Sequence, residues 1–139
     1  MSRQTVRIMF DTNILVSAIL NNRGTPNAAL LKAFESQYAV VLCDQIIDEL
    51  RRVYNIKFPS RIPDMERFLS TAHYDLVTLT ATDSIIADEK TIRDAADRPL
   101  LRAARKARVD ILVTGDKDFL ESGLNTPKIL KAAEFLALP

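Results

Sequence analysis

Short runs of apolar, β-type residues alternate along this chain with segments of helical periodicity, and that alternation restricts the fold more than any other feature. We expect strands at residues 6–10, 38–43, 76–80, 110–114 and 129–130. We expect helices at 14–20, 28–34, 44–54, 64–73 and 132–136, and another that begins at residue 97. Strands separated by helices form a mostly parallel sheet with helices packed on it. The sequence therefore predicts one α/β domain over residues 1–139.

The composition fits a globular domain and excludes several classes of protein. The 139 residues are 47% hydrophobic, and a chain of this length buries roughly two-thirds of the surface that its unfolded form exposes. The apolar run at 14–20 is too short to cross a bilayer, and Asp11 interrupts the N-terminal apolar stretch, which argues against a secretory signal. The single cysteine, Cys43, excludes an internal disulfide. We expect a cytoplasmic protein that does not enter a membrane.

Two aspartates follow predicted strands near the point where each strand ends. Asp11 comes directly after residues 6–10, and Asp116 comes shortly after 110–114. Functional groups of open parallel sheets gather beyond the carboxyl ends of the strands. If these two strands are neighbours, which is an inference from fold rules, their carboxylates converge.

Helical phase adds two further carboxylates to this group. On the helix after residue 44, Glu49 lies at the edge of the apolar face, whereas Asp48 points toward solvent. Asp97 opens a later helix and lies at the margin of its apolar stripe, which is formed by Leu100, Ala104 and Ala107. We therefore expect Glu49 and Asp97 to face the same end of the sheet.

Four carboxylates in one cleft would repel one another and raise one another's pKa unless cations neutralised them. Oxygen ligands suit Mg²⁺ or Mn²⁺, ions that assist displacement at a phosphodiester. Taken singly, Asp11, Asp97 and Asp116 are each better explained as caps of a helix or turn. Their combination with Glu49 favours a metal site and a phosphodiesterase.

The order and spacing of these motifs resemble the PIN-domain ribonucleases over nearly the whole chain. The matching segments are FDTN at 10–13, DEL at 48–50, Asp97 before an alanine-rich helix, VTGDKDF at 113–119, IL at 129–130 and EFL at 134–136. The resemblance is greatest to stand-alone bacterial PIN proteins regarded as toxins of toxin–antitoxin pairs.

This resemblance implies a three-layer α/β/α sandwich around a parallel sheet of about five strands, and metal-dependent cleavage of single-stranded RNA. Carried over by motif, the residues that would hold Mg²⁺ or Mn²⁺ and orient the attacking water are Asp11, Glu49, Asp97 and Asp116. Asn13 and Thr114 would steady the cluster through hydrogen bonds, and Asp118 would be either an additional ligand or a group that supports the ligands.

The third acidic position has two candidates. Many relatives carry a denser acidic run there, whereas this chain reads RDAADRP over residues 93–99. Asp97 is favoured because the apolar stripe fixes its direction, and Asp94 is the alternative. Basic residues near these acids are candidates for contacts with RNA phosphates: Arg98, Arg102 and Lys117.

The expected partners are single-stranded RNA, a small antitoxin protein and further copies of the chain in a dimer or tetramer. One alternative is a non-catalytic PIN-like module that binds RNA or protein without cutting. A second alternative is a phosphatase that uses Asp11 as its nucleophile, but Asn13 stands where the haloacid-dehalogenase motif has a second aspartate.

The net charge of +1 masks an uneven distribution of charge. Of 18 acidic residues, five belong to the proposed site, so 13 remain against 19 basic residues and the rest of the chain carries +6. A neutral total is therefore compatible with a nucleic-acid partner.

Overall fold

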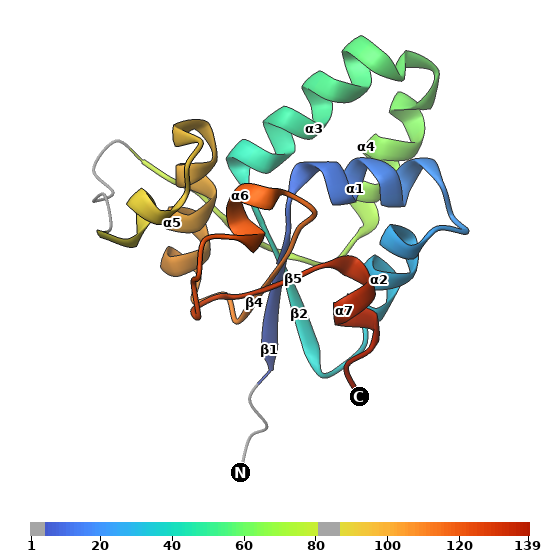
Figure 1. The fold of residues 1–139 in the computed structure, drawn as a ribbon. Helices are drawn as coiled ribbons and strands as arrows, with labels where there is room; N and C mark the ends of the chain where they lie inside the picture. Colours follow the sequence, from blue (N-terminus) through green and yellow to red (C-terminus); the bar gives the residue numbers. More distant parts are fainter. Residues whose placement is uncertain (1–4, 81–86) are drawn as a thin grey trace.

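The computed structural model describes residues 5–80 and 87–139, and a five-stranded sheet lies at its centre (Figure 1). The strands are β1 (Val6–Phe10), β2 (Tyr38–Cys43), β3 (Asp75–Val77), β4 (Ile111–Val113) and β5 (Lys128–Leu130). They lie in the order β3-β2-β1-β4-β5, and every pairing is parallel. This arrangement confirms the predicted α/β class.

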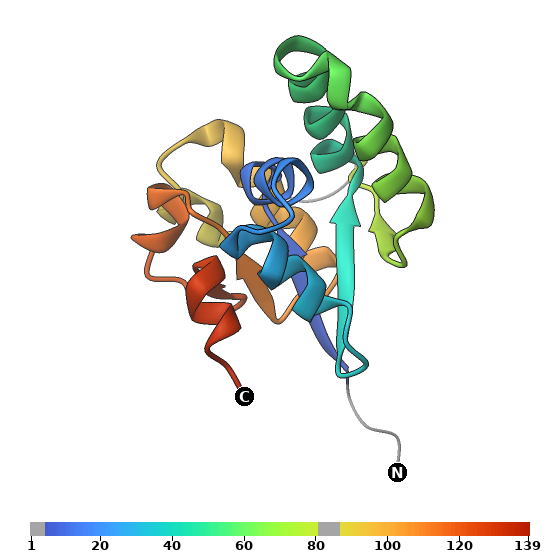
Figure 2. The same ribbon diagram turned by 90° about the vertical axis from the view of Figure 1, so that its right-hand side faces the viewer.

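Helices cover both faces of the sheet and complete a three-layer α/β/α sandwich (Figures 1 and 2). The α-helices are α1 (Thr12–Leu20), α2 (Thr25–Ala33), α3 (Asp44–Lys57), α4 (Ile62–Thr71), α5 (Arg98–Lys106), α6 (Lys117–Leu120) and α7 (Ala132–Leu136). The described residues also contain the short 3₁₀ helices η1 (Pro59–Arg61), η2 (Ala87–Thr91) and η3 (Ala95–Asp97). Helices α1, α2 and α7 lie on one side of the sheet and α5 on the other, while α3 and α4 extend beyond the strands' carboxyl ends (Figure 1).

The central strand β1 has β4 as its neighbour, as the fold rules predicted. Met9 of β1 lies opposite Val41 of β2 on one side and opposite Leu112 of β4 on the other. The segments that follow β1 and β4 therefore begin side by side. This pairing places Asp11 close to Asp116.

Aromatic side chains fill the core between β1 and the helices on its face. The rings of Phe135 and Phe10 meet edge to face with their centroids 6.4 Å apart. The ring centroids of Tyr38 and Phe135 are 5.2 Å apart. Such pairs add to the free energy gained by burying the rings. Because Phe10 precedes Asp11 in the chain, this packing also fixes where the first carboxylate begins.

Several boundaries differ from those expected from periodicity. Helix α1 begins at Thr12 because the Asp11 side chain caps it, and α2 begins at Thr25 with a proline in its first turn. Strand β3 is only three residues long, at the edge of the sheet. The four-residue helix α6 was not expected, since a single turn is too short to show a periodic pattern.

The buried face of α5 also differs in part from the one expected. The sequence predicted a stripe of Leu100, Ala104 and Ala107. Ala104 is buried as expected, but Leu100 and Ala107 are half-buried, and Leu101 and Ala103 complete the buried face. Because Leu100 and Leu101 are adjacent, the sequence is compatible with either of two helix faces being buried, and the packing of α5 against the rest of the domain determines which one is. Among the described residues, no helix is long and apolar enough to cross a membrane.

Replacing Phe135 should destabilise the domain strongly. Phe135→Ala deletes a fully buried ring and leaves a cavity, so we expect the free energy of unfolding to fall by about 3–5 kcal/mol. Urea unfolding monitored by circular dichroism measures the change. Ile56→Ala is the control, because Ile56 is 72% exposed and its truncation should change stability by less than about 0.5 kcal/mol. Equal losses in the two variants would contradict this account of the core.

Candidate functional site

Asp11 and Asp116 lie at the carboxyl ends of the neighbouring strands β1 and β4, and each also caps a helix. The Asp11 backbone N–H donates to the Val113 carbonyl oxygen at 3.1 Å, which continues the strand pairing. One Asp11 carboxylate oxygen accepts from the Ile14 N–H at 3.1 Å, and Asp116 accepts from the Asp118 N–H at 2.9 Å. Asp11 and Asp116 therefore do cap helices, which is the non-functional role that the sequence had suggested for each of them. These hydrogen bonds also fix the direction of both carboxylates.

The hydroxyl of Thr114 joins the two aspartates. Thr114 is completely buried and donates its hydroxyl proton to the second carboxylate oxygen of Asp11. The same hydroxyl oxygen accepts a hydrogen bond from the Asp116 N–H at 3.0 Å. One side chain therefore sets the spacing between the ends of β1 and β4.

A cleft beyond the ends of these strands brings together four carboxylates from four separate segments of the chain. Its acidic lining consists of Asp11, Glu49, Asp97 and Asp116. Its apolar wall includes Ile46, Leu100 and Phe119, and Asn13 and Cys43 also line it. The sequence had not indicated the apolar wall. Phe119 lies on the unexpected helix α6, and Cys43 was assigned only to the core.

Helical phase predicted that Asp48 points toward solvent, which is confirmed, and that Glu49 lies at the edge of the apolar face, whereas Glu49 is exposed. Glu49 lines the cleft, whereas its neighbour Asp48 is exposed and lies outside it. Glu49 is itself exposed, so it reaches the cleft from the solvent side rather than from the core.

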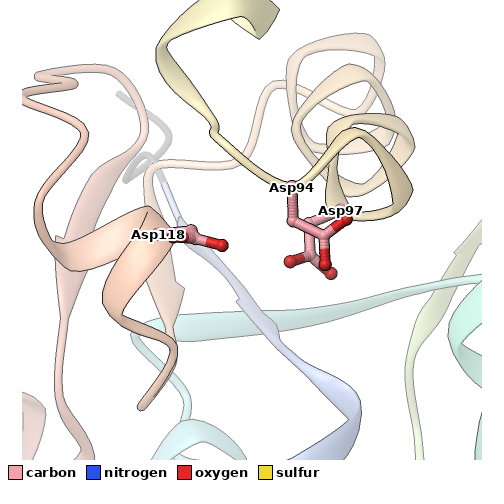
Figure 3. Close-up of side chains that lie close together, drawn as sticks. All are labelled: Asp94, Asp97 and Asp118. Atoms are coloured by element: carbon pink, nitrogen blue, oxygen red, sulfur yellow. The ribbon is translucent and has the colours of Figure 1, made fainter.

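A second acidic group overlaps the cleft. Figure 3 shows Asp118 of α6 facing Asp94 and Asp97, and one carboxylate oxygen of each lies within 4.8 Å of the others. Asp94 is exposed, caps η3 by accepting from the Ala96 N–H at 3.0 Å, and is not part of the cleft lining. Asp97 makes no capping hydrogen bond and belongs to both groups. The geometry therefore favours Asp97 over Asp94 for the third position.

The environment of the cleft disfavours negative charge on two of its carboxylates. Burial raises the pKa of Asp11, and the charges of Asp116 and Glu49 add to the shift, while its hydrogen bonds oppose it. Burial also raises the pKa of Asp97 to about 7, helped by a hydrogen bond shared with Asp116 and by the charges of Asp116, Asp94 and Asp118. A bound cation would offset this repulsion.

Arg93 supplies a positive charge at the edge of the acidic group. It contacts Asp118 at 2.9 Å and Glu121 at 3.0 Å. Asp118 is therefore engaged by an arginine from the segment that carries Asp94. Nothing in the spacing of these residues indicated the contact, because it joins α6 to a loop 25 residues away.

The basic residues singled out from the sequence have different surroundings. Arg98 donates to the Ile92 carbonyl oxygen at 3.0 Å, and Arg102 makes two 2.8 Å hydrogen bonds to the carboxylate of Glu89. Lys117 is exposed and lies in the chain between Asp116 and Asp118. The buried Glu89 was not recognised from the sequence, where it falls in a polar stretch without periodicity.

Comparison with known proteins gives a family and a fold. A family model described as the PIN domain matches residues 7–118. An uncharacterized protein of Methanocaldococcus jannaschii is 28% identical over 126 residues, which cover 86% of this chain and 77% of that protein. The crystal structure of VapBC2 from Rickettsia felis, bound to a DNA fragment from its promoter, matches with a TM-score of 0.65 at 19% identity. That match covers 91% of this chain and 98% of the other.

The raised pKa of Asp97 predicts how stability depends on pH without metal. In the folded state the Asp97 carboxyl group keeps its proton up to about pH 7, whereas in the unfolded state it loses the proton near pH 3.8. The free energy of unfolding should therefore fall as the pH rises from about 4 to 7. In EDTA, the Tm of Asp97→Asn should fall less than that of the wild type between about pH 4 and 7, as followed by circular dichroism. Asp48→Asn removes the same charge from an exposed position and should track the wild type. Parallel curves for Asp97→Asn and the wild type would contradict the assignment.

Proposed function

The chain belongs to the PIN-domain family, and we propose that it is a divalent-metal-dependent endoribonuclease that cuts single-stranded RNA. The observation that carries the proposal is the convergence of Asp11, Glu49, Asp97 and Asp116 on one cleft. Caps alone account for two of these residues, but not for Glu49 or for Asp97, which makes no capping hydrogen bond.

The donors of the cleft fit a hard divalent cation. All four acidic groups offer oxygen atoms, and carboxylate oxygens are the ligands that Mg²⁺ and Mn²⁺ prefer. Burial and, to a smaller extent, the neighbouring negative charges raise the pKa of Asp11 and Asp97, and a bound cation would offset both effects, which supports the same assignment. When bound, such an ion supplies Lewis acidity toward a water molecule and a phosphate oxygen. Asp118 is a further candidate ligand at the edge of the site.

The protein's own groups orient the reaction. Asp11 has both carboxylate oxygens engaged, one by the Ile14 N–H and one by the Thr114 hydroxyl, so its position does not depend on substrate. Thr114 also fixes the backbone of Asp116. Preorganised carboxylates of this kind align a water molecule with the scissile phosphate at little entropic cost. Asn13 is exposed and lines the cleft, and its proposed role is to steady the acidic cluster through hydrogen bonds.

Recognition of RNA is proposed to rest on its backbone. With six Phe, three Tyr and no Trp, the chain has few rings on which bases could stack. Lys117 is the favoured phosphate contact, because it is exposed and adjacent to Asp116. Arg98 and Arg102 are less suited, since their guanidinium groups bind the protein itself.

Cleavage of a single-stranded RNA in Mn²⁺ should depend on the acidic cleft. We expect EDTA to abolish cleavage, and Asp11→Asn to lower the rate by more than the roughly 10–100-fold typical of losing a group that only supports a metal ligand. Gel analysis of an end-labelled RNA measures both effects.

A pair of adjacent residues on α3 provides the matched control. Glu49→Gln should also slow cleavage strongly, whereas Asp48→Asn should leave it unchanged, because only Glu49 lines the cleft. Cleavage that survived both EDTA and Asp11→Asn would overturn the mechanism. Metal binding without cleavage would instead favour a module that binds RNA or protein and does not cut.

We further propose that the protein is the toxin of a toxin–antitoxin pair, acting in the cytoplasm as a dimer or tetramer with a small antitoxin protein. The resemblance of its ordered motifs to stand-alone bacterial PIN proteins supports this role. So does the similarity of its fold to VapBC2, a complex bound to a DNA fragment from its own promoter.

Induced expression in a bacterium tests the toxin role. We expect the wild-type chain to arrest growth and Asp11→Asn to permit it at equal protein levels, because the arrest requires the cleft. Co-expression of the product of a small neighbouring reading frame should restore growth and co-purify with the toxin. Normal growth despite RNA cleavage in vitro would leave the nuclease proposal intact and refute the toxin proposal.

A further inference from the structure

Glu89 is a buried carboxylate that the proposed reaction does not use. Only 3% of its surface is exposed, and it is not part of the cleft lining. Both of its carboxylate oxygens accept hydrogen bonds from Arg102, each at 2.8 Å. Two parallel charge-assisted hydrogen bonds hold the partners in a fixed orientation. Since an unpaired buried carboxylate is strongly unfavourable, this pair ties η2 to α5.

The arginines of α5 form a row that faces the segment carrying η2. Arg98, Arg102 and Arg105 are spaced by four and then three residues, so they lie on one face of the helix. Arg98 donates to the Ile92 carbonyl oxygen at 3.0 Å, and Arg105 contacts Asp88 at 2.7 Å. The row therefore binds the protein's own backbone and carboxylates.

Of the two ion pairs that this row makes within residues 5–80 and 87–139, the pair of Arg102 with Glu89 is more protected from water than the pair of Arg105 with Asp88. The side chains of Glu89 and Arg102 are 4% and 22% exposed, against 51% and 28% for Asp88 and Arg105. Exposed pairs contribute little to stability, whereas breaking a buried pair by removing one partner has a large effect. The pair of Glu89 and Arg102 is thus the stronger of these two ion pairs, which attach the segment carrying η2 to α5.

The attached segment leads directly to the third acidic position. It consists of short 3₁₀ helices rather than a strand, so the sheet does not fix it. Ile92, fully buried, anchors it after η2, and the chain then presents Asp94 and Asp97. Arg93 holds the same stretch from the other side through Asp118.

We propose that Glu89 and Arg102 form a positioning pair that holds the segment carrying Asp97, so that Asp97 can share a divalent cation with the other carboxylates of the cleft. The pair acts through the backbone and touches neither metal nor RNA. Its metal role rests on the proposed function, whereas its effect on the segment does not. The inference assigns Arg102 to the interior, in place of the phosphate contact suggested by the sequence.

Amide hydrogen exchange in the metal-free protein tests the positioning directly. The reporters are the N–H groups of Ile92, Ala96 and Asp97, which donate within this segment. We expect Glu89→Gln and Arg102→Gln to speed their exchange, while amides of β1 remain protected. Asp88→Asn, which alters the exposed neighbouring pair, should have a much smaller effect. Unchanged exchange at the three reporters in both pair variants would overturn the proposal.

Mn²⁺ titration by calorimetry tests the consequence for the site. Loss of a group that supports a metal ligand lowers affinity by roughly 10–100-fold, and we expect this for either single variant, measured well below its Tm. The double variant Glu89→Gln/Arg102→Gln should be no worse than the singles, because both remove one interaction. Arg102→Lys, which keeps the charge, should recover part of the affinity.

The alternatives give different results. If Arg102 bound RNA phosphate, Arg102→Gln would weaken RNA binding while Glu89→Gln left both RNA and Mn²⁺ binding unchanged, which would overturn the proposal. A lowered Tm with wild-type Mn²⁺ affinity would reduce the pair to a stabilising contact and also overturn it. If the wild-type chain bound no Mn²⁺, the proposed function would fail, and the exchange measurement would still decide whether the pair holds the segment.

Discussion

The parallel pairing of β1 with β4 is the constraint on which the site depends. It brings the ends of two strands that lie a hundred residues apart in sequence to adjacent positions, and the buried Thr114 hydroxyl then links Asp11 to the backbone of Asp116. Because parallel strands end at the same edge of a sheet, carboxylates placed there are forced together whatever their mutual repulsion. The stability of the surrounding core, including the ring of Phe135, opposes that repulsion.

The parts of the fold predicted from sequence are those with a repeating local signal. Strands β1 and β2 were placed with their observed bounds, and Glu49 was separated from Asp48 by helical phase alone. Helical phase did not identify the whole buried face of α5, because two adjacent leucines are compatible with either of two faces of the helix. It also gave no sign of α6, whose single turn is shorter than any period.

Contacts between helices and the irregular segment at 87–97 could not be predicted from the sequence for a different reason. The bonds from Arg102 to Glu89 and from Arg93 to Asp118 join residues whose spacing repeats nowhere in the chain. Arginines on the polar face of a helix can contact solvent or a phosphate group, and the sequence does not distinguish these cases from contact with another segment of the protein. Burial of Glu89 distinguishes these cases, and burial in a loop has no pattern in the sequence.

A divalent cation bound as proposed would compete with a proton for the carboxylates of Asp97 and Asp116. Two carboxyl groups can share a hydrogen bond only while one proton remains between them. Burial, together with the neighbouring Asp116, raises the pKa of Asp97 to about 7, so this proton is lost as the pH rises through neutrality. A divalent cation that takes the same oxygens must displace it, so protons and cations compete. By thermodynamic reciprocity, acidity weakens cation binding by the same factor that the cation weakens proton binding. Occupancy of the cleft would then report the pH around the protein as well as the concentration of the ion.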